Sequence, residues 1–490
     1  LLSGHEYYRY KYNYALGEKT GIVGGIDELG PAVTTTDNNS YSHNYGVESY
    51  LARINYGFKS RYYIDASWRT DGSSRFHPSD RWGHFWSVGA SWRISEEQFM
   101  ENPRQWLDNL TLKVSYGVQG NDNLGTYYAW QGLYDYTWPN ATDAGAFVDK
   151  LENRKVTWEK NGNLNAGIEA TMFGGRLGVS VEYYNRKTRD MLLNSPLPIS
   201  TGFTGFNDNV GSLRNQGLEV SLRGTILDKR DFRWDATLMG SFNRNKVLSL
   251  TGGQDVITSG IRVIEVGRPI YTFYLPKTAG VDPATGKQLY YAYWTQTVND
   301  EGTLVNTRCD EYITDNVAMA TLSKYYHESR EPKLFGSIGS TFTILKNIDV
   351  SFLTTYSIGG WVYDGLYNGS MYVQYAGNNW HKNAKRRWQK PGDKTDVPML
   401  EVGGSYATTS NSLIDASYFA IKNITVGYTL PKRWLKKIDI ESLRIYATLD
   451  NIAMFNHMDG MDPQYNFTGS VAYSYTCLLY TSDAADERIS

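Results

Sequence analysis

The chain has 490 residues, 41% hydrophobic and 14% aromatic, and its 49 basic and 51 acidic residues leave a net charge of −2, which argues against a nucleic-acid-binding surface. Two cysteines, Cys309 and Cys477, are too few for a disulfide scaffold, and no apolar run approaches the about 18 residues of a membrane helix. The 39 Tyr and 14 Trp favour strands that end at a membrane–water interface or surfaces that stack on sugars, with a Tyr-rich soluble β protein as the alternative.

Strands with one apolar face dominate the N-terminal part of the chain. Period-two alternation predicts strands over 1–14, 50–58, 62–69, 88–94 and 110–118. Clusters of Gly, Thr, Asn and Ser predict loops at 15–49 and 70–78, and a short polar turn at 59–61. We expect one short helix within 95–109.

The clearest alternation follows a long loop expected at 120–160. Strands are predicted at 164–172 and 177–184, around the turn at 173–176. Within 209–250, Leu218, Val220 and Leu222 fall on one face of a strand, while Glu219 and Arg223 fall on the other. A second alternating run starts at 232, so only the polar residues 227–231 connect this hairpin.

The C-terminal part continues the pattern with longer interruptions. We expect an irregular stretch at 249–332, a hairpin of strands 335–345 and 348–358, and a loop at 359–415. Strands at 418–429 and 443–450 follow, separated by a helical turn within 430–442. This makes about thirteen strands in all.

Short and long connections alternate along the whole chain. In an up-and-down antiparallel sheet this parity places every short turn at one end and every long loop at the other, as in outer-membrane barrels. A Greek-key sandwich would not keep the parity, and strands of about 10 residues match a tilted bilayer span. The sequence therefore predicts an all-β protein, an antiparallel up-and-down transmembrane β-barrel. The alternative is a large soluble β protein.

A membrane barrel assigns the two strand faces to different surroundings. We expect the apolar stripes to meet lipid; they are Leu177, Val179, Val181, Leu218, Val220 and Leu222. We expect charged residues of the opposite faces to line a polar lumen; they are Glu182, Glu219, Arg223 and Arg233.

Catalytic and metal-binding patterns were not found in the sequence, which lacks the nucleophile-elbow, phosphate-loop and zinc-helix motifs. The segment 282–287 suggests a calcium loop but lacks alternating acidic ligands, so a plain turn is favoured. Trp361, Trp380 and Trp388 could contact substrate by stacking on sugar rings in an outer loop, although loop packing or an interface girdle is the simpler interpretation. We expect no catalytic residue, metal or cofactor, and no enzyme activity.

Several segments, taken together and in order, resemble one known family. They are NY at 55–56, RYY at 61–63, RTDGSSRF at 69–76, WG at 82–83, WRISEE at 92–97, NRKT at 185–188, NVGS at 209–212, NQGLE at 215–219, FNRNKV at 242–247, LP at 430–431 and DNI at 450–452. The family is that of the SusC-like (RagA/SusC type) outer-membrane transporters of Bacteroidetes, a branch of the TonB-dependent receptors.

The resemblance implies active import of a large nutrient, an oligosaccharide or peptide, across the outer membrane. It implies a SusD-like surface lipoprotein and the TonB complex as partners, with no nucleic acid. Two other classes stay open: a surface glycan-binding or adhesive β protein without transport, and a secreted β-rich hydrolase. A barrel requires the apolar stripes of all its strands to lie on the same face of the sheet. A hydrolase requires instead a pair of acidic residues that face a cleft.

The chain also departs from the family pattern. Family members carry a plug and a TonB-contact segment that we do not expect within this sequence, and plugged transporters of this kind close at roughly 22 strands. The sequence thus predicts that 1–475 is the C-terminal part of the barrel, without the plug. Residues 476–490 lack a period-two stripe and resemble a translated sequencing adapter, so we expect a non-native tail and an unclosed barrel wall.

Overall fold

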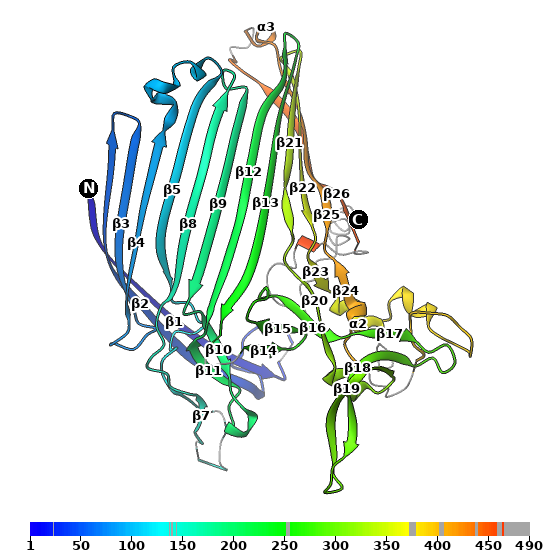
Figure 1. The fold of residues 1–490 in the computed structure, drawn as a ribbon. Helices are drawn as coiled ribbons and strands as arrows, with labels where there is room; N and C mark the ends of the chain where they lie inside the picture. Colours follow the sequence, from blue (N-terminus) through cyan, green and yellow to red (C-terminus); the bar gives the residue numbers. More distant parts are fainter. Residues whose placement is uncertain are drawn as a thin grey trace.

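The computed structural model describes residues 1–464 except 23, 137, 139–140, 144, 251–254, 372–378, 401–405, 437–439 and 458–462. One 13-stranded sheet dominates it, and every neighbouring pair of strands is antiparallel (Figure 1). In the order of the sheet, its strands are β1 (Leu2–Thr20), β2 (Thr34–Phe58), β3 (Tyr62–Ser73), β4 (Trp82–Arg93), β5 (Leu107–Asn121), β8 (Glu159–Met172), β9 (Leu177–Arg189), β12 (Ser212–Lys229), β13 (Phe232–Ser249), β21 (Leu334–Ile344), β22 (Ile348–Ile358), β25 (Tyr418–Thr429) and β26 (Arg444–Asn456).

The sheet follows the chain order without a crossover, so it is an up-and-down wall. Strands β1 and β26 form its two ends and do not pair with each other, and Figure 1 shows the wall curved and open. The expected all-β partial barrel of thirteen strands is confirmed. The tail expected at 476–490 lies outside the described residues.

The two ends of the wall differ, as the connection parity predicts. Figure 1 shows the short connections at the top and the long ones at the bottom. At the top, Lys59 and Ser60 have φ of 51° and 54°, and Leu345 and Lys346 have φ of 50° and 63°. Two consecutive residues with positive φ make the tight turn whose twist matches a hairpin.

Two loop expectations at the N-terminal end are wrong in part, and so is the expectation of one helix. The polar tract at 34–49 is part of β2, and 15–20 belongs to β1, because the two strands pair from Leu2↔Arg53 to Thr20↔Thr34. Strand β3 runs on to Ser73. In place of one helix within 95–109 there are three 3₁₀ turns, η1 (Ile94–Glu96), η2 (Gln98–Met100) and η3 (Pro103–Gln105), and Pro103 has no N–H to continue a helix.

The long connections hold further structure that the sequence did not predict. Their strands are β6 (Leu133–Asp135), β7 (Phe147–Lys150), β10 (Leu192–Pro196), β11 (Gly205–Asn209), β14 (Val256–Ser259), β15 (Arg262–Glu265), β16 (Thr272–Pro276), β17 (Thr278–Val281), β18 (Gln288–Val298), β19 (Leu304–Thr314), β20 (Lys324–Ser329), β23 (Trp361–Tyr363) and β24 (Leu413–Asp415). Helices α1 (Val317–Leu322) and α2 (Gly365–Met371) lie among them, and α3 (Lys432–Leu435) is the helical turn expected within 430–442.

The expectation of an irregular stretch at 249–332 is therefore wrong. Most of its strands are only four to six residues long, too short to show alternation, and they pair within two small sheets. Phe273 and Leu275 of β16 bury against Leu413 of β24, so strands distant in sequence share one core. Burial of these apolar side chains, rather than local pattern, stabilises the segment.

The hairpin of β12 and β13 is tighter than predicted. A bulge between Thr225 and Leu227 shifts the pairing, so that Leu227 lies opposite Trp234 and β12 continues to Lys229. Only Arg230 and Asp231 remain as the connection, in place of the expected 227–231. Such an extra residue bends the strand and increases its twist, which suits a curved wall.

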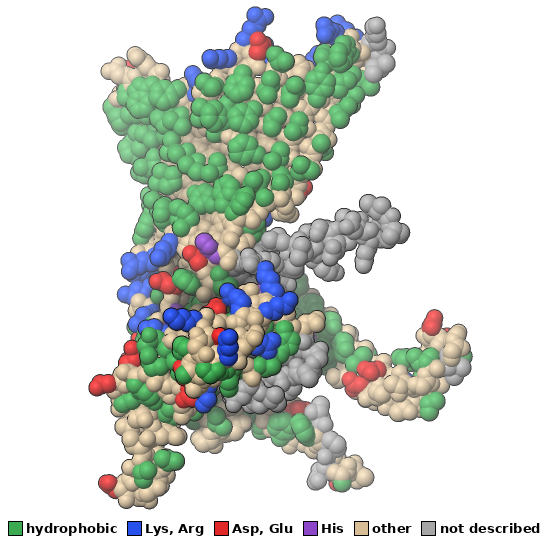
Figure 2. Space-filling view, turned by 90° about the vertical axis from the view of Figure 1, so that its right-hand side faces the viewer, with side chains coloured by type: hydrophobic (Ala, Val, Ile, Leu, Met, Phe, Trp, Pro, Cys, Tyr) green, Lys and Arg blue, Asp and Glu red, His purple; other side chains and the backbone are tan. Residues whose placement is uncertain are grey.

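A continuous hydrophobic band covers the wall (Figure 2), between a rim of Lys and Arg and the charged loop region. Its strands expose large apolar side chains that a soluble protein would bury; Ile64, Val114, Ile168 and Val426 are each 43–52% exposed. Buried hydrophobic clusters lie instead among the long connections, one of them formed around Phe76, Phe85 and Trp158. An exposed apolar surface of this extent marks contact with a membrane.

Candidate functional site

The predicted face residues of β9 and β12 lie in register. Glu219 is directly opposite Glu182, the next pair is Val220 with Val181, and Leu222 is opposite Val179. Because alternate side chains of a strand point to opposite faces, the carboxylates share one face and the aliphatic residues share the other.

The remaining predicted residues follow the same geometry. Leu177 lies opposite Gly224, two positions beyond the pair made by Leu222. Arg223 lies four residues from Glu219 and opposite Thr237, on the face of the carboxylates. Arg233 donates from Nε to Oδ2 of Asp235 over 2.7 Å.

A hollow of about 500 Å³ lies on the carboxylate face. Glu182 and Glu219 line it together with Tyr184, Arg186 and Glu331. The hydroxyl of Tyr184 donates to Oδ1 of Asn243 over 2.8 Å, which fixes the phenol ring across β9 and β13. The hollow thus combines both signs of charge with hydrogen-bonding groups, a lining that suits a hydrated polar ligand.

Glu331 brings an ionisable group into this hollow from the connection between β20 and β21. Burial raises the pKa of its carboxyl to about 7, and a backbone hydrogen bond at Asn245 only partly opposes the shift. Near neutral pH the hollow therefore carries a group that gains or loses its charge readily. Sequence reasoning missed Glu331 because its position in the predicted irregular stretch showed no pattern.

The three tryptophans of the C-terminal loop pack against their own surroundings. Trp361 packs against the cluster of Phe273, Leu275 and Leu413, while Trp380 packs beside the cluster that contains Met371 and Val397. The guanidinium of Arg387 lies 4.8 Å from the centre of the Trp380 ring.

Trp388 is held by a specific contact. Its Nε1 donates to the carbonyl oxygen of Pro283 over 2.9 Å, and a Cβ on Gly286 would overlap its ring. These contacts are those of loop packing, and the structure does not bring the three tryptophans together into one stacking surface. Their contact with substrate stays a prediction.

The segment 282–287 adopts a turn between β17 and β18. The carboxylate of Asp282 accepts from the backbone N–H of Ala284 over 3.0 Å and from the hydroxyl of Thr285 over 2.6 Å. Among the residues that the structure describes, no group of three or more His, Cys, Asp and Glu could hold a metal ion. Within the same part of the chain, no helix is long and apolar enough to cross a membrane.

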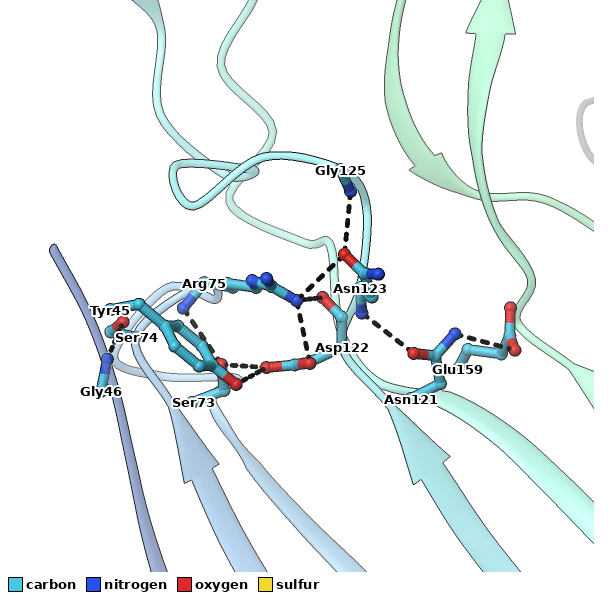
Figure 3. A network of polar contacts seen from close by, with 10 residues as sticks. All are labelled: Tyr45, Gly46, Ser73, Ser74, Arg75, Asn121, Asp122, Asn123, Gly125 and Glu159. Carbon is cyan, nitrogen blue, oxygen red and sulfur yellow. Dashed lines mark hydrogen bonds and ion pairs between the residues drawn. The ribbon is translucent and has the colours of Figure 1, made fainter. Parts of the chain in front are cut away.

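A polar network ties three long-loop ends of the wall together (Figure 3). Asp122, just after β5, accepts from the hydroxyls of Tyr45 and Ser73 over 2.8 and 2.7 Å. Arg75 pairs with the same carboxylate over 3.1 Å, and the two side chains are only 12% and 14% exposed.

The Arg75 guanidinium also lies 4.5 Å from the centre of the Tyr45 ring. We call Tyr45, Ser73, Arg75 and Asp122 the loop clamp. Sequence reasoning quoted Ser73 and Arg75 only as part of a motif and missed their partners, because 47 residues separate Arg75 from Asp122.

The fold and its two faces define the wall of a transmembrane β-barrel. A family model described as "TonB dependent receptor-like, beta-barrel" matches residues 1–452, so the chain belongs to this family. The outer membrane is therefore the location of the chain, and the resemblance noted from the sequence is confirmed.

Particular relatives refine this assignment. TonB-dependent receptor P39 of Formosa agariphila is 29% identical over 473 residues, with 89% of this chain and 45% of that protein covered. TonB-dependent receptor SusC of Bacteroides thetaiotaomicron is 28% identical over 444 residues, with 87% and 42% covered. The structure of the RagAB peptide transporter matches with a TM-score of 0.81 and 29% identity, covering 94% of this chain and 50% of that one. The chain spans about half the length of the relatives it matches.

Proposed function

We propose that this chain is the barrel part of a TonB-dependent importer that carries a large nutrient, an oligosaccharide or peptide, across the outer membrane. The observation that carries the proposal is that one wall has two different faces. One face is polar and holds the hollow at Glu182 and Glu219, and the opposite face is apolar. The similarity to SusC and to the RagAB peptide transporter supports it.

In this proposal each face of the wall has its own role. The stripes of Leu218, Val220 and Leu222 on β12, and of Leu177, Val179 and Val181 on β9, contact lipid. Glu182, Glu219, Arg223 and Arg233 line the lumen. Contact of Trp361, Trp380 and Trp388 with substrate stays part of this proposal, although each of them also packs within the loops.

The partners follow from the same proposal. A SusD-like surface lipoprotein would cover the end of the wall that carries the long connections. Two small sheets lie there, one formed by β14, β15, β16 and β20 and the other by β17, β18 and β19. The TonB complex would supply the energy for import. The chain would carry substrate without transforming it, so it is not an enzyme.

Growth experiments test the proposal. The full-length gene is deleted from its host and restored on a plasmid, with oligosaccharides and peptides each offered as the sole carbon source. We expect growth on at least one of them to require both the gene and TonB. Binding of the nutrient at the cell surface with no gene-dependent and TonB-dependent uptake would contradict import and favour a glycan-binding or adhesive protein.

A further inference from the structure

The pairing of β2 with β3 ends at Val47, which lies opposite Ser73, and residues 34–46 of β2 pair with β1 alone. The two strands form a ribbon that projects from the wall at the end with the long connections. Six rings occupy alternate positions of this ribbon, in three directly opposed pairs. The pairs are Tyr10 with Tyr45, Tyr12 with His43, and Tyr14 with Tyr41, and we call these six residues the aromatic array.

The rings of the aromatic array form a continuous surface. Tyr10 and Tyr12 stack with centroids 6.5 Å apart and planes 7° apart. Tyr14 stacks on Tyr41 at 4.8 Å, and Tyr41 lies 5.0 Å from His43. Alternate strand positions share a face, so all six rings lie on one side of the ribbon.

One end of the aromatic array is fixed and the other is open. Tyr127, from the connection after β5, packs at 5.7 Å from the Tyr10 ring and at 5.3 Å from the His43 ring. The loop clamp holds Tyr45 in place through Asp122. At the open end, Tyr12 and Tyr41 are 37% and 44% exposed, so part of each ring is accessible to a ligand.

The chemistry of the aromatic array is that of rings and hydroxyls without charge. In 8–16 and 39–47, all described, the only cationic side chains are Arg9 and Lys11, and both alternate to the opposite face of the ribbon. The face of an aromatic ring is electron-rich and attracts C–H groups, such as those on the faces of neutral sugar rings. Charged side chains lie only at the two ends of this face, with Arg75 over the Tyr45 ring at one end and the opposed pair of Glu18 and Asp37 beyond the other. Between them, the rings around Tyr12 and Tyr41 offer no carboxylate, ammonium or guanidinium group to pair with the charged termini and side chains of a peptide.

We propose that the open end of the aromatic array, around Tyr12 and Tyr41, is a stacking platform for a neutral oligosaccharide. The platform binds sugar rings face to face, and the phenol hydroxyls contact the sugar hydroxyls at the edge of each ring. This inference rests on the proposed function in one respect only, because it names the class of nutrient that the importer collects. Binding on the platform does not itself need transport.

Calorimetric titration of the purified full-length protein tests the platform, with maltohexaose, xylohexaose, mannohexaose and hexa-alanine as probes. We expect at least one hexasaccharide to bind, and Tyr12→Ala/Tyr41→Ala to weaken that binding about tenfold, the effect of roughly 1.4 kcal/mol. Tyr12→Phe/Tyr41→Phe keeps both rings and should bind within about threefold of the unchanged protein. Tyr7→Ala is the matched control, because Tyr7 is 64% exposed on the opposite face of β1, and it should leave affinity unchanged.

Heat-modifiable migration on gels confirms that each variant is folded before it is titrated. The platform is refuted if no hexasaccharide binds, if the double alanine variant binds like the unchanged protein, or if only hexa-alanine binding depends on Tyr12 and Tyr41. Growth assays separate the two proposals. Array-dependent binding without TonB-dependent uptake would refute the importer and leave the platform, whereas TonB-dependent uptake with array-independent binding would do the reverse.

Discussion

Replacing Asp122 by Asn should loosen the loop clamp while leaving the wall intact. The carboxylate accepts from Tyr45, Ser73 and Arg75 at once, whereas an amide offers one acceptor oxygen and two N–H groups that would face donors. The variant also leaves the guanidinium of Arg75, only 12% exposed, without its counter-charge.

The structure sets the size of this effect. Removing one partner of a buried ion pair costs about 3–5 kcal/mol, and the residual exposure of both side chains places this pair near 3 kcal/mol. The matched control is Glu169→Gln. Glu169 pairs with Lys113 on the wall, and because both side chains are about half exposed, the loss should stay below about 1 kcal/mol.

Hydrogen exchange followed by mass spectrometry reads the effect locally. Because the clamp joins loop ends, we expect Asp122→Asn to speed exchange in 122–158 by about 100-fold, the factor that about 3 kcal/mol gives, with little change in β8 and β9. A double-mutant cycle with Arg75→Met should show a coupling of at least about 1.5 kcal/mol. Unchanged exchange in 122–158, or an equal effect of Glu169→Gln, would refute the clamp.

Three further substitutions test other parts of the structure. Val220→Arg should lower the free energy of unfolding in liposomes by about 2–4 kcal/mol and Glu219→Arg by much less, because only the first places a charge against lipid; equal losses would contradict the assignment of faces. Burial raises the pKa of Glu331 to about 7, so its protonated form stabilises the fold fully below about pH 4.5 and this contribution is lost as pH rises toward 7. Glu331→Gln should flatten that part of the pH dependence measured by urea unfolding and gain up to about 3 kcal/mol at pH 8, while an unchanged slope would show that Glu331 is not the group responsible. Gly286→Ala should expose its loop to limited proteolysis, since Gly286 has a φ of 75° and a Cβ there would overlap Trp388; cleavage at the original rate would count against this packing.

What the sequence determined by itself is the wall. Alternation with period two is a property of the extended backbone, so strands such as β12 and β13, and the opposite faces of Glu219 and Val220, are readable without knowledge of their neighbours. The parity of short and long connections then orders the strands, because consecutive antiparallel strands must turn at alternate ends.

Only the tertiary structure decided which polar segments pair and which charged groups become buried. The tract at 34–40 carries no apolar stripe and is a strand because β1 supplies hydrogen-bonding partners for its backbone. Arg75 and Asp122 meet because β3 and β5, with β4 between them, end at the same edge of the wall. Glu331 is buried because the connection after β20 places it against the wall, beside Asn245 of β13. These outcomes depend on contacts between residues distant in sequence, and no local pattern of side chains encodes such contacts.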